Sequence, residues 1–200
     1  MNREVYTYDN RRAAYNGFVD AAFKFIEEFQ LISPEHWQRF VYQFESDADS
    51  NRGWKGEYWG KMMRGACLVY AYTRNQKLYD TLEDAIEGMI NAASDDGRIS
   101  SYPRNNEFCG WDMWCRKYVL LGMQYFLDIC QSDELRAQVI ASMRGQLDYI
   151  MAHIGPKAEG KKEINKATNN WRGLNSSSIL EPVVRLYNLT GEQKYFDFAR

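Results

Sequence analysis

The sequence predicts an all-α protein whose helical hairpins form part of an α/α barrel, and two observations predict it. A segment led by tryptophan recurs at Trp54, Trp111 and Trp171, with spacings of 57 and 60 residues, and each copy opens a long apolar stretch. A repeat of this length with two helices per unit is typical of stacked helical hairpins. Within each unit, a helix that is apolar on most sides precedes a helix with one apolar stripe. This contrast favours an inner ring of buried helices inside an outer ring.

Local patterns predict the first two helices and the loop that follows them. Ser33 and Pro34 begin the second helix, because serine is a good N-cap and proline suits a first turn. Residues 45–53 are polar and predict a loop. Residues 12–31 predict the first helix, with apolar side chains at helical spacing at Ala14, Phe18, Ala21, Ala22, Phe25, Ile26 and Phe29.

The two layers can be assigned to residue ranges. We expect Leu121 and Phe126 of the inner layer to be buried, and Arg136 and Arg144 of the outer layer to face solvent. The inner layer comprises residues 57–74, 110–131 and 175–189, and the outer layer comprises residues 77–94 and 133–154.

Turns and loops fit this arrangement. Ser132 is placed to cap the helix that follows it, and Gly191 is a helix-stop residue. The connections from outer to inner helices, residues 95–108 and 155–168, are longer than the other turns. Long loops at one end of a helical ring are where function tends to lie.

Composition excludes several classes of function. The net charge of −2 provides no basic surface, so we expect no nucleic-acid partner. No apolar run approaches the ~20 residues of a membrane span, and residues 1–12 contain no apolar core of a signal peptide. The four cysteines show no CxxC spacing, which favours core thiols in a reducing cytoplasm.

Aromatic side chains make up 15% of the chain and favour an aromatic-lined cleft, the kind that binds sugars. Trp54, Trp59, Trp111 and Trp114 are candidates to stack on sugar rings, or they pack the helices of the core. Trp114 shares a stripe with Tyr118 and fits the core better. The candidate substrate-binding residues are Glu57, Trp59, Trp111, Asp112, Arg116, Lys117 and Asn175.

The polar candidates each have a structural alternative. Glycosidases need two carboxyl groups in proximity, but Glu57, Asp112 and Glu181 near helix starts also compensate helix dipoles. For Glu181, the spacing from Ser178 fits a capping box, with hydroxyl binding as the alternative.

The roles of two cationic residues and one polar segment also have a functional and a structural interpretation. Arg116 and Lys117 lie one turn into an apolar helix, so each contacts a ligand or forms a structural ion pair. Asn175 and the serines after it form either a hydroxyl-binding rim or an ordinary helix-start loop.

Four segments together resemble the β-L-arabinofuranosidase family, glycoside hydrolase family 127. They are WKGEYWGKMMRGA (54–66), GRISSYP (97–103), GWDMWCRKYVLLG (110–122) and WRGLNSSSILEPVVRLYNLTG (171–191). The resemblance implies an (α/α)6 barrel that hydrolyses terminal arabinofuranosyl or related sugars of plant-type glycans. In that reading, residues 1–200 are the N-terminal part of the catalytic domain, truncated after about three to four hairpins.

The resemblance also implies a mechanism whose parts this chain does not carry. The family uses a glutamic acid as general acid/base and a zinc-bound cysteine as nucleophile, and both fall beyond Arg200. None of the four cysteines matches that motif. We therefore expect no catalytic residue, metal ligand or cofactor here, although zinc is implied for complete members. Lys117 aligns with a histidine that contacts substrate in the family, which leaves the sugar open.

Two other functions are compatible with the helical repeat, and an incomplete ring has a consequence for the isolated chain. The chain could belong to another α/α-barrel carbohydrate enzyme, such as an unsaturated-uronyl hydrolase or polysaccharide lyase. A non-catalytic α-solenoid adaptor is disfavoured, because tetratricopeptide units are about 34 residues long. An unclosed ring would leave an apolar wall, so we expect the isolated chain to be marginally folded or to self-associate.

Overall fold

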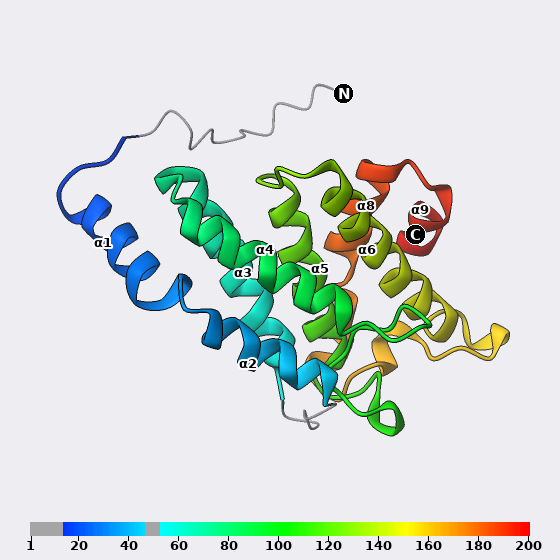
Figure 1. Cartoon of the computed structure of the whole chain (residues 1–200). Coiled ribbons are helices and arrows are strands. Elements are labelled where there is room, and N and C mark those ends of the chain that lie inside the picture. Colours follow the sequence, from blue (N-terminus) through cyan, green and yellow to red (C-terminus); the bar gives the residue numbers. More distant parts are fainter. Residues whose placement is uncertain (1–13, 47–52) are drawn as a thin grey trace.

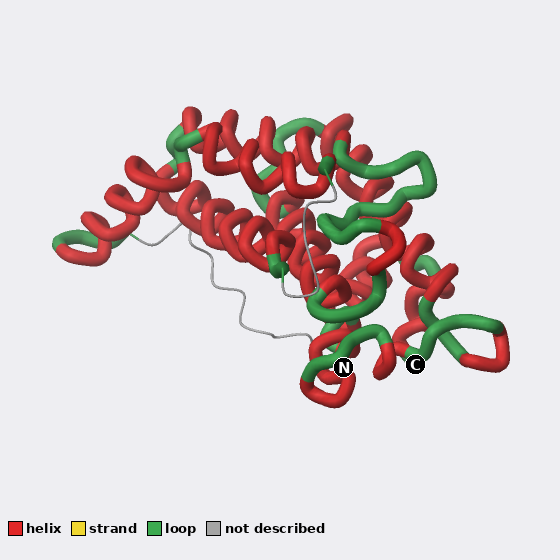
Figure 2. The backbone as a smooth tube through the Cα atoms, turned by 90° about the horizontal axis from the view of Figure 1, so that it is seen from below, coloured by secondary structure: helices red, strands yellow, loops and turns green. Residues whose placement is uncertain are grey.

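The computed structural model describes residues 14–46 and 53–200, and in these ranges all regular elements are helical (Figures 1 and 2). An isolated β-bridge joins Ile154 to Lys162. A π-helical turn, Glu27–Leu31, extends the first helix, and short 3₁₀ turns lie at Arg104–Asn106, Lys157–Glu159, Ile164–Lys166 and Trp171–Gly173. The α-helices are α1 Phe18–Ile26, α2 Pro34–Glu45, α3 Lys55–Thr73, α4 Gln76–Asn91, α5 Asp112–Leu127, α6 Asp133–His153, α7 Leu174–Ser177, α8 Leu180–Thr190 and α9 Gln193–Ala199.

The helices follow one another across the molecule from α1 to α9 and form two layers (Figure 1). α3 packs against α5, and α5 packs against α7 and α8. On the other side, α4 contacts both α2 and α6. This confirms the all-α hairpin fold, with α3, α5 and α8 in one layer and α2, α4 and α6 in the other. None of the helices in the described ranges is long and apolar enough to cross a membrane.

Glycines bring α3 and α5 into backbone contact. A Cβ added to Gly60 would overlap the carbonyl oxygen of Tyr118, and one on Gly56 would lie 2.8 Å from the Cys115 carbonyl oxygen. In the opposite direction, a Cβ on Gly122 would lie 2.9 Å from the ring of Trp59. The missing side chains therefore allow the close approach. The contact fixes the register that brings the starts of α3 and α5 to the same end of the molecule.

The contrast in burial between α5 and α6 confirms the expected layering at that hairpin. Leu121 and Phe126 of α5 are buried, and Arg144 of α6 is exposed. Arg136 differs from the prediction, because it is half-buried. Its guanidinium donates to the carbonyl oxygen of Leu127 at 2.7 Å. The expectation that it faces solvent was wrong, because the last carbonyls of α5 need donors that the helix itself cannot supply.

The other two inner helices are less buried than the sequence indicates. α3 exposes a stripe that includes Tyr58, Lys61, Arg64 and Leu68. α8 exposes Leu180, Glu181, Val184 and Arg185 in the same way. These stripes, together with the part-buried residues of α5 between them, form what we call the concave face.

The third inner helix is broken where the sequence predicted one continuous stretch. The hydroxyl of Ser178 donates to the carbonyl oxygen of Asn175 at 2.5 Å, and Pro182 cannot donate to the carbonyl of residue 178. The chain therefore leaves α7 and restarts as α8 after Ile179. The capping-box prediction was wrong, because the N-cap of α8 is Ile179 and the Glu181 carboxylate accepts from Arg185 at 3.1 Å.

Other local predictions hold. Ser132 caps α6 by accepting from the backbone N–H of Leu135 at 3.1 Å, and Gly191 ends α8 with φ of 72°. α2 begins at Pro34 as expected. The first predicted helix begins at Phe18; its residues 12–13, and residues 47–52 of the predicted loop, lie outside the described residues. Its apolar stripe points outward, with Phe18 87%, Phe25 59% and Phe29 68% exposed.

Candidate functional site

The three tryptophans that lead the repeated segments meet at one hollow. The rings of Trp111 and Trp171 lie edge to face, with centroids 5.0 Å apart and an interplanar angle of 87°. Trp114 meets Trp171 at 5.8 Å and 88°. The hollow has a volume of about 360 Å³ and is lined by Trp54, Glu57, Tyr58, Lys61, Trp111, Trp114 and Trp171. We call it the tryptophan hollow, and its lining is aromatic, as the composition of the chain favoured.

Trp171 reaches the hollow through strained backbone. Trp171, Arg172 and Gly173 all have positive φ, at 49°, 53° and 95°. Left-handed backbone costs roughly 1–2 kcal/mol for each non-glycine residue. Gly173 is required at its position, because a Cβ there would lie 2.7 Å from the Cα of Asn165. Such strain clusters at ligand sites, where it holds a side chain in place.

A carboxylate and an ammonium form the polar side of the hollow. Lys61 Nζ donates to Glu57 Oε1 at 2.6 Å, one helical turn away on α3. This hydrogen bond raises the pKa of Lys61. The side chain of Glu57 is 20% exposed and that of Lys61 is 54% exposed. Both groups can therefore be reached by a ligand that stacks on the tryptophans.

The concave face continues from the hollow along α5 and α8. The ammonium of Lys117 lies 4.7 Å from the centroid of the Trp114 ring and 4.5 Å from that of Tyr118. Arg64 and Arg185 lie over the ring of Tyr125, at 5.0 and 5.7 Å. Cations that alternate with ring faces give this surface both stacking area and positive charge.

Two predicted ligand contacts, Asp112 and Arg116, lie instead in a sealed polar network. Asp112 is 0% exposed and Arg116 is 1% exposed. Arg116 Nε donates to both oxygens of Asp112 at 3.0 Å. Asp112 also accepts from the Ser100 hydroxyl at 2.6 Å and from the Phe108 backbone N–H at 2.9 Å. Their carboxylate and guanidinium are thus fully engaged, which supports the structural ion pair over the sugar contact.

The network extends to residues that the sequence did not identify. Glu107 accepts from Arg98, from Arg116 Nη2 at 3.1 Å and from the Tyr149 hydroxyl at 2.6 Å. Burial, and then the bond to Glu107, raise the pKa of Tyr149 to about 12. The network joins the loop of residues 95–108 to α5 and α6, which explains why the GRISSYP segment needs its arginine.

Two further candidates, Trp59 and Asn175, also have structural roles. Trp59 is 0% exposed and packs against Gly122, so its ring has no free face for a sugar. Asn175 is 1% exposed and donates to the Gly110 carbonyl oxygen at 3.2 Å. Its side chain ties α7 to the start of the α5 segment.

The hollow therefore contains Glu57 and Trp111 of the seven predicted residues, with Lys117 next to it on the concave face. Sequence reasoning missed Tyr58, Lys61 and Trp171 as lining residues, and it placed Trp114 in the core. The signal for Trp171 was its place as the third leading tryptophan. The signal for Lys61 was its spacing of four residues from Glu57, which places both on one side of a helix.

Zinc is implied by the family that the sequence resembles, and the described residues do not fit it. Among residues 14–46 and 53–200, no three His, Cys, Asp or Glu side chains gather to hold a metal ion. Cys67, for example, is buried in α3, and burial raises the pKa of its thiol well above its usual range.

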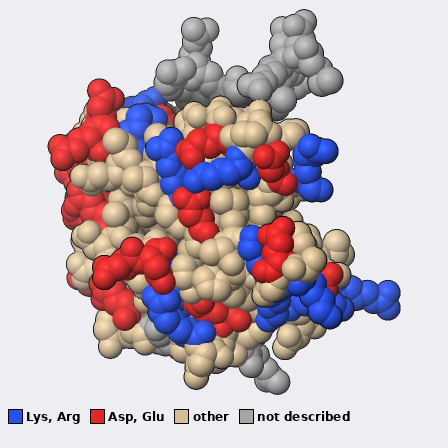
Figure 3. Space-filling model, turned by 90° about the vertical axis from the view of Figure 1, so that its right-hand side faces the viewer, with Lys and Arg blue, Asp and Glu red and all other residues tan. Residues whose placement is uncertain are grey.

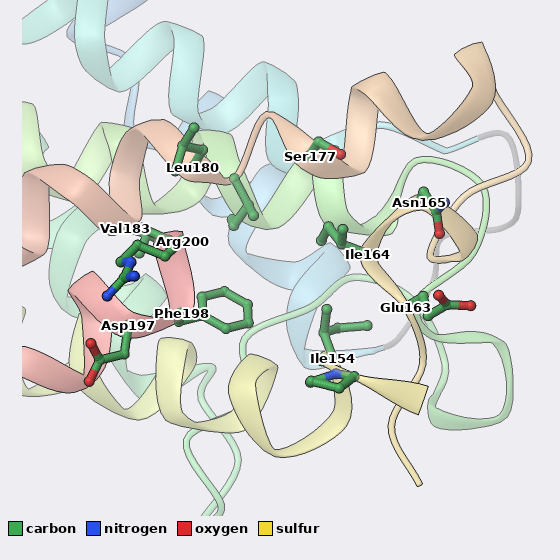
Figure 4. Close-up of a pocket in the computed structure, with 14 residues that line it drawn as sticks. Ile154, Glu163, Ile164, Asn165, Ser177, Leu180, Val183, Asp197, Phe198 and Arg200 are labelled. Atoms are coloured by element: carbon green, nitrogen blue, oxygen red, sulfur yellow. The ribbon is translucent and has the colours of Figure 1, made fainter. Parts of the chain in front are cut away.

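A second, larger hollow lies between α8, α9 and the segment around Ile154 and Ile164 (Figure 4), with a volume of about 590 Å³. Ile154, Ile164 and Phe198 border its middle, whereas the carboxylates of Glu163 and Asp197 point outward (Figure 4). On the nearby surface, positive and negative side chains are mixed and neither forms a continuous field (Figure 3). Its middle is bordered by apolar side chains, whereas ligand pockets combine such a lining with a few placed polar groups.

Comparison with known proteins identifies the family. Residues 6–200 match the family described as "Beta-L-arabinofuranosidase, GH127 catalytic domain". The chain belongs to this family. No curated protein sequence matches it. Among solved structures, it is similar to a GH127 β-L-arabinofuranosidase from Geobacillus stearothermophilus T6, with 15% sequence identity and a TM-score of 0.67. The match covers 94% of this chain and 31% of that one, so the chain spans about a third of its relative's length.

Three of the four motifs of this GH127 chain surround the tryptophan hollow. Residues 54–66 supply Trp54, Glu57 and Lys61, residues 110–122 supply Trp111 and Trp114, and residues 171–191 supply Trp171. The fourth motif, residues 97–103, belongs to the buried network behind α5. The motifs thus divide into one group that lines a surface and one that supports it.

Proposed function

We propose that this chain supplies part of the substrate cleft of a glycoside hydrolase that removes terminal arabinofuranosyl or related sugars from plant-type glycans. The convergence of Trp54, Trp111, Trp114 and Trp171 on one hollow carries the proposal. Flat aromatic surfaces pack against the C–H faces of sugar rings, and a few polar groups orient the hydroxyls. Glu57 and Lys61 provide those polar groups at the edge of the hollow.

We further propose that the described part of the chain binds sugar without cleaving it. Glycoside hydrolysis needs two carboxyl groups about 5–5.5 Å or 6.5–9.5 Å apart. Among the described residues, Glu57 is the one carboxylate that lines the hollow. Asp112 is sealed in the network, and Glu181 accepts from Arg185. The family's acid/base and zinc-bound thiolate would have to come from elsewhere in a complete enzyme.

A titration monitored by tryptophan fluorescence tests the binding surface. We expect methyl β-L-arabinofuranoside to quench the emission of the chain, because four tryptophans line the hollow. Trp171→Ala should weaken the apparent affinity about 5- to 30-fold, which corresponds to the ~1–2 kcal/mol of a lost ring contact. Tyr42→Ala is the matched control, since Tyr42 is an exposed aromatic residue on α2, outside the hollow. Equal affinity in Trp171→Ala and wild type would contradict the proposal.

We also propose that the chain resides in the cytoplasm, as its buried Cys67 thiol suits a reducing compartment.

A second proposal is self-association through apolar side chains that α1 and α8 leave exposed, which include Phe18, Phe25, Leu180 and Val184. Exposed apolar surface of this kind is typical of an interface. Size-exclusion chromatography with light scattering tests it: the apparent mass should rise with concentration, and a monomer at all concentrations would contradict it.

A further inference from the structure

Lys117 is a buried ammonium group that lacks the hydrogen bonds such a group needs. The residue is 9% exposed, and its side chain keeps 11% of its surface exposed at the concave face. Among the described residues, its Nζ makes no hydrogen bond. Its nearest oppositely charged atom is Glu181 Oε2, at 4.0 Å. An ammonium carries three donors, and burying it without partners costs free energy.

The carboxylates near Lys117 already have closer partners. Glu57 accepts from Lys61 at 2.6 Å, and Glu181 accepts from Arg185 at 3.1 Å. The ring faces of Trp114 and Tyr118 stabilise the ammonium only in part. Glu181 therefore balances the charge of Lys117 only in part, at 4.0 Å, and the ammonium makes no hydrogen bond within the described residues.

A second unpaired donor lies next to it. The indole N–H of Trp114 is buried and has no hydrogen-bond partner in the described structure. Trp114 also lines the tryptophan hollow, and the ammonium of Lys117 lies against its ring, so Lys117 is next to the hollow. Lys61 lies over the same Tyr118 ring as Lys117, at 5.1 Å, which adds a second cation to this end of the face. Unpaired buried donors at a concave surface are typical of a site that a ligand completes.

We propose that Lys117 binds the carboxylate of a uronic-acid-type sugar that stacks in or beside the tryptophan hollow. The inference rests on the proposed function and deepens it, because it gives the glycan an acidic component. The ligand's oxygens would accept from the ammonium, which makes no hydrogen bond within the described residues, and the pair would be partly shielded from water. Charge-assisted hydrogen bonds of this kind are roughly twice as strong as neutral ones.

The ionisation of Lys117 supports this role and offers a readout. Burial lowers the pKa of Lys117, while Glu181 and Glu57 oppose the shift and Lys61 and Arg64 add to it. An anion bound at Nζ favours the charged form. Affinity for an acidic sugar should therefore fall as the pH rises through the pKa of Lys117, while affinity for a neutral sugar should not change.

Calorimetric titration of the chain with D-galacturonate and with its neutral methyl ester tests the proposal. We expect wild type to bind the acid at least tenfold more tightly than the ester, in line with one charge-assisted hydrogen bond. Lys117→Met should remove this preference. Lys77→Met is the matched control, because it removes an exposed lysine on α4 and should keep the preference.

Each outcome separates the two proposals. Equal binding of acid and ester by wild type would overturn the inference, even if Lys117→Met failed to fold. Preference for galactose 6-sulfate over the uronate would overturn the carboxylate assignment. If methyl β-L-arabinofuranoside still binds while the uronate gains nothing, the proposed function stands and this inference fails. If the uronate binds through Lys117 and the arabinofuranoside does not bind, the inference stands and the arabinofuranosyl substrate is wrong.

Discussion

Replacing Glu107 by glutamine should destabilise the chain strongly, although Glu107 does not line the tryptophan hollow. The carboxylate of Glu107 is 6% exposed and accepts from Arg98, Arg116 and Tyr149. Glutamine keeps the shape but removes the negative charge, and its NH₂ group presents donors to guanidinium donors. Arg116 would keep its pair with Asp112, whereas Arg98 would lose the carboxylate that it binds.

The magnitude follows from these contacts. At least one charge-assisted hydrogen bond is lost, at about 1.5–3 kcal/mol. A guanidinium left uncompensated in the interior adds to this loss, and breaking a buried pair typically costs 3–5 kcal/mol in total. We therefore expect Glu107→Gln to lower the free energy of unfolding by about 3–5 kcal/mol.

Urea denaturation measures this difference. Glu159→Gln is the matched control, because it makes the same chemical change in a surface pair with Lys161, where Glu159 is 56% exposed. Exposed pairs contribute ~0–1 kcal/mol, so the control should change little. If Glu107→Gln cost no more than Glu159→Gln at an unchanged m-value, the network would not hold the loop of residues 95–108 in the way we describe.

Three further predictions concern activity, packing and pH. The purified chain should show no turnover of aryl arabinofuranosides with or without zinc; turnover above a no-protein blank would contradict this and point to Glu57. Gly60→Ala should lower the free energy of unfolding by several kcal/mol, because the added Cβ would overlap the carbonyl oxygen of Tyr118. Gly65→Ala, whose Cβ would meet open space, should raise it by roughly 0.5–1 kcal/mol. Similar melting temperatures for the two variants would refute the close packing of α3 and α5. The pKa of Tyr149 is about 12 in the folded chain and about 10 in the unfolded chain. The contribution of its neutral phenol to the free energy of unfolding is therefore complete below pH 10 and is lost between pH 10 and 12, by up to ~1.4 kcal/mol per pH unit. Denaturation curves that do not change over this interval would show that Tyr149 is not sheltered from solvent.

The sequence by itself determined most helices and the order of the layers, because these depend on local chemistry and periodicity, but it did not show the break between α7 and α8. Ser132 and Gly191 mark helix ends through hydrogen bonds and backbone angles set within a few residues. The difference between an all-round apolar helix and a one-stripe helix predicted that α5 would be buried and that α6 would have an exposed side. The spacing of the leading tryptophans predicted repeated helical hairpins, and the high aromatic content favoured an aromatic-lined cleft.

The tertiary structure alone decided which side chains of these helices are accessible. Trp59 and Trp111 both lie near helix starts, but Gly122 lets α5 cover one of them completely while the other lines the hollow. Arg116 and Lys117 are neighbours on one helix, yet Arg116 meets Glu107 and Lys117 has no partner of that kind. Periodicity shows which residues share a helix face. The partner on that face comes from a segment elsewhere in the chain, and this partner decides whether a charge is a structural element or a binding group.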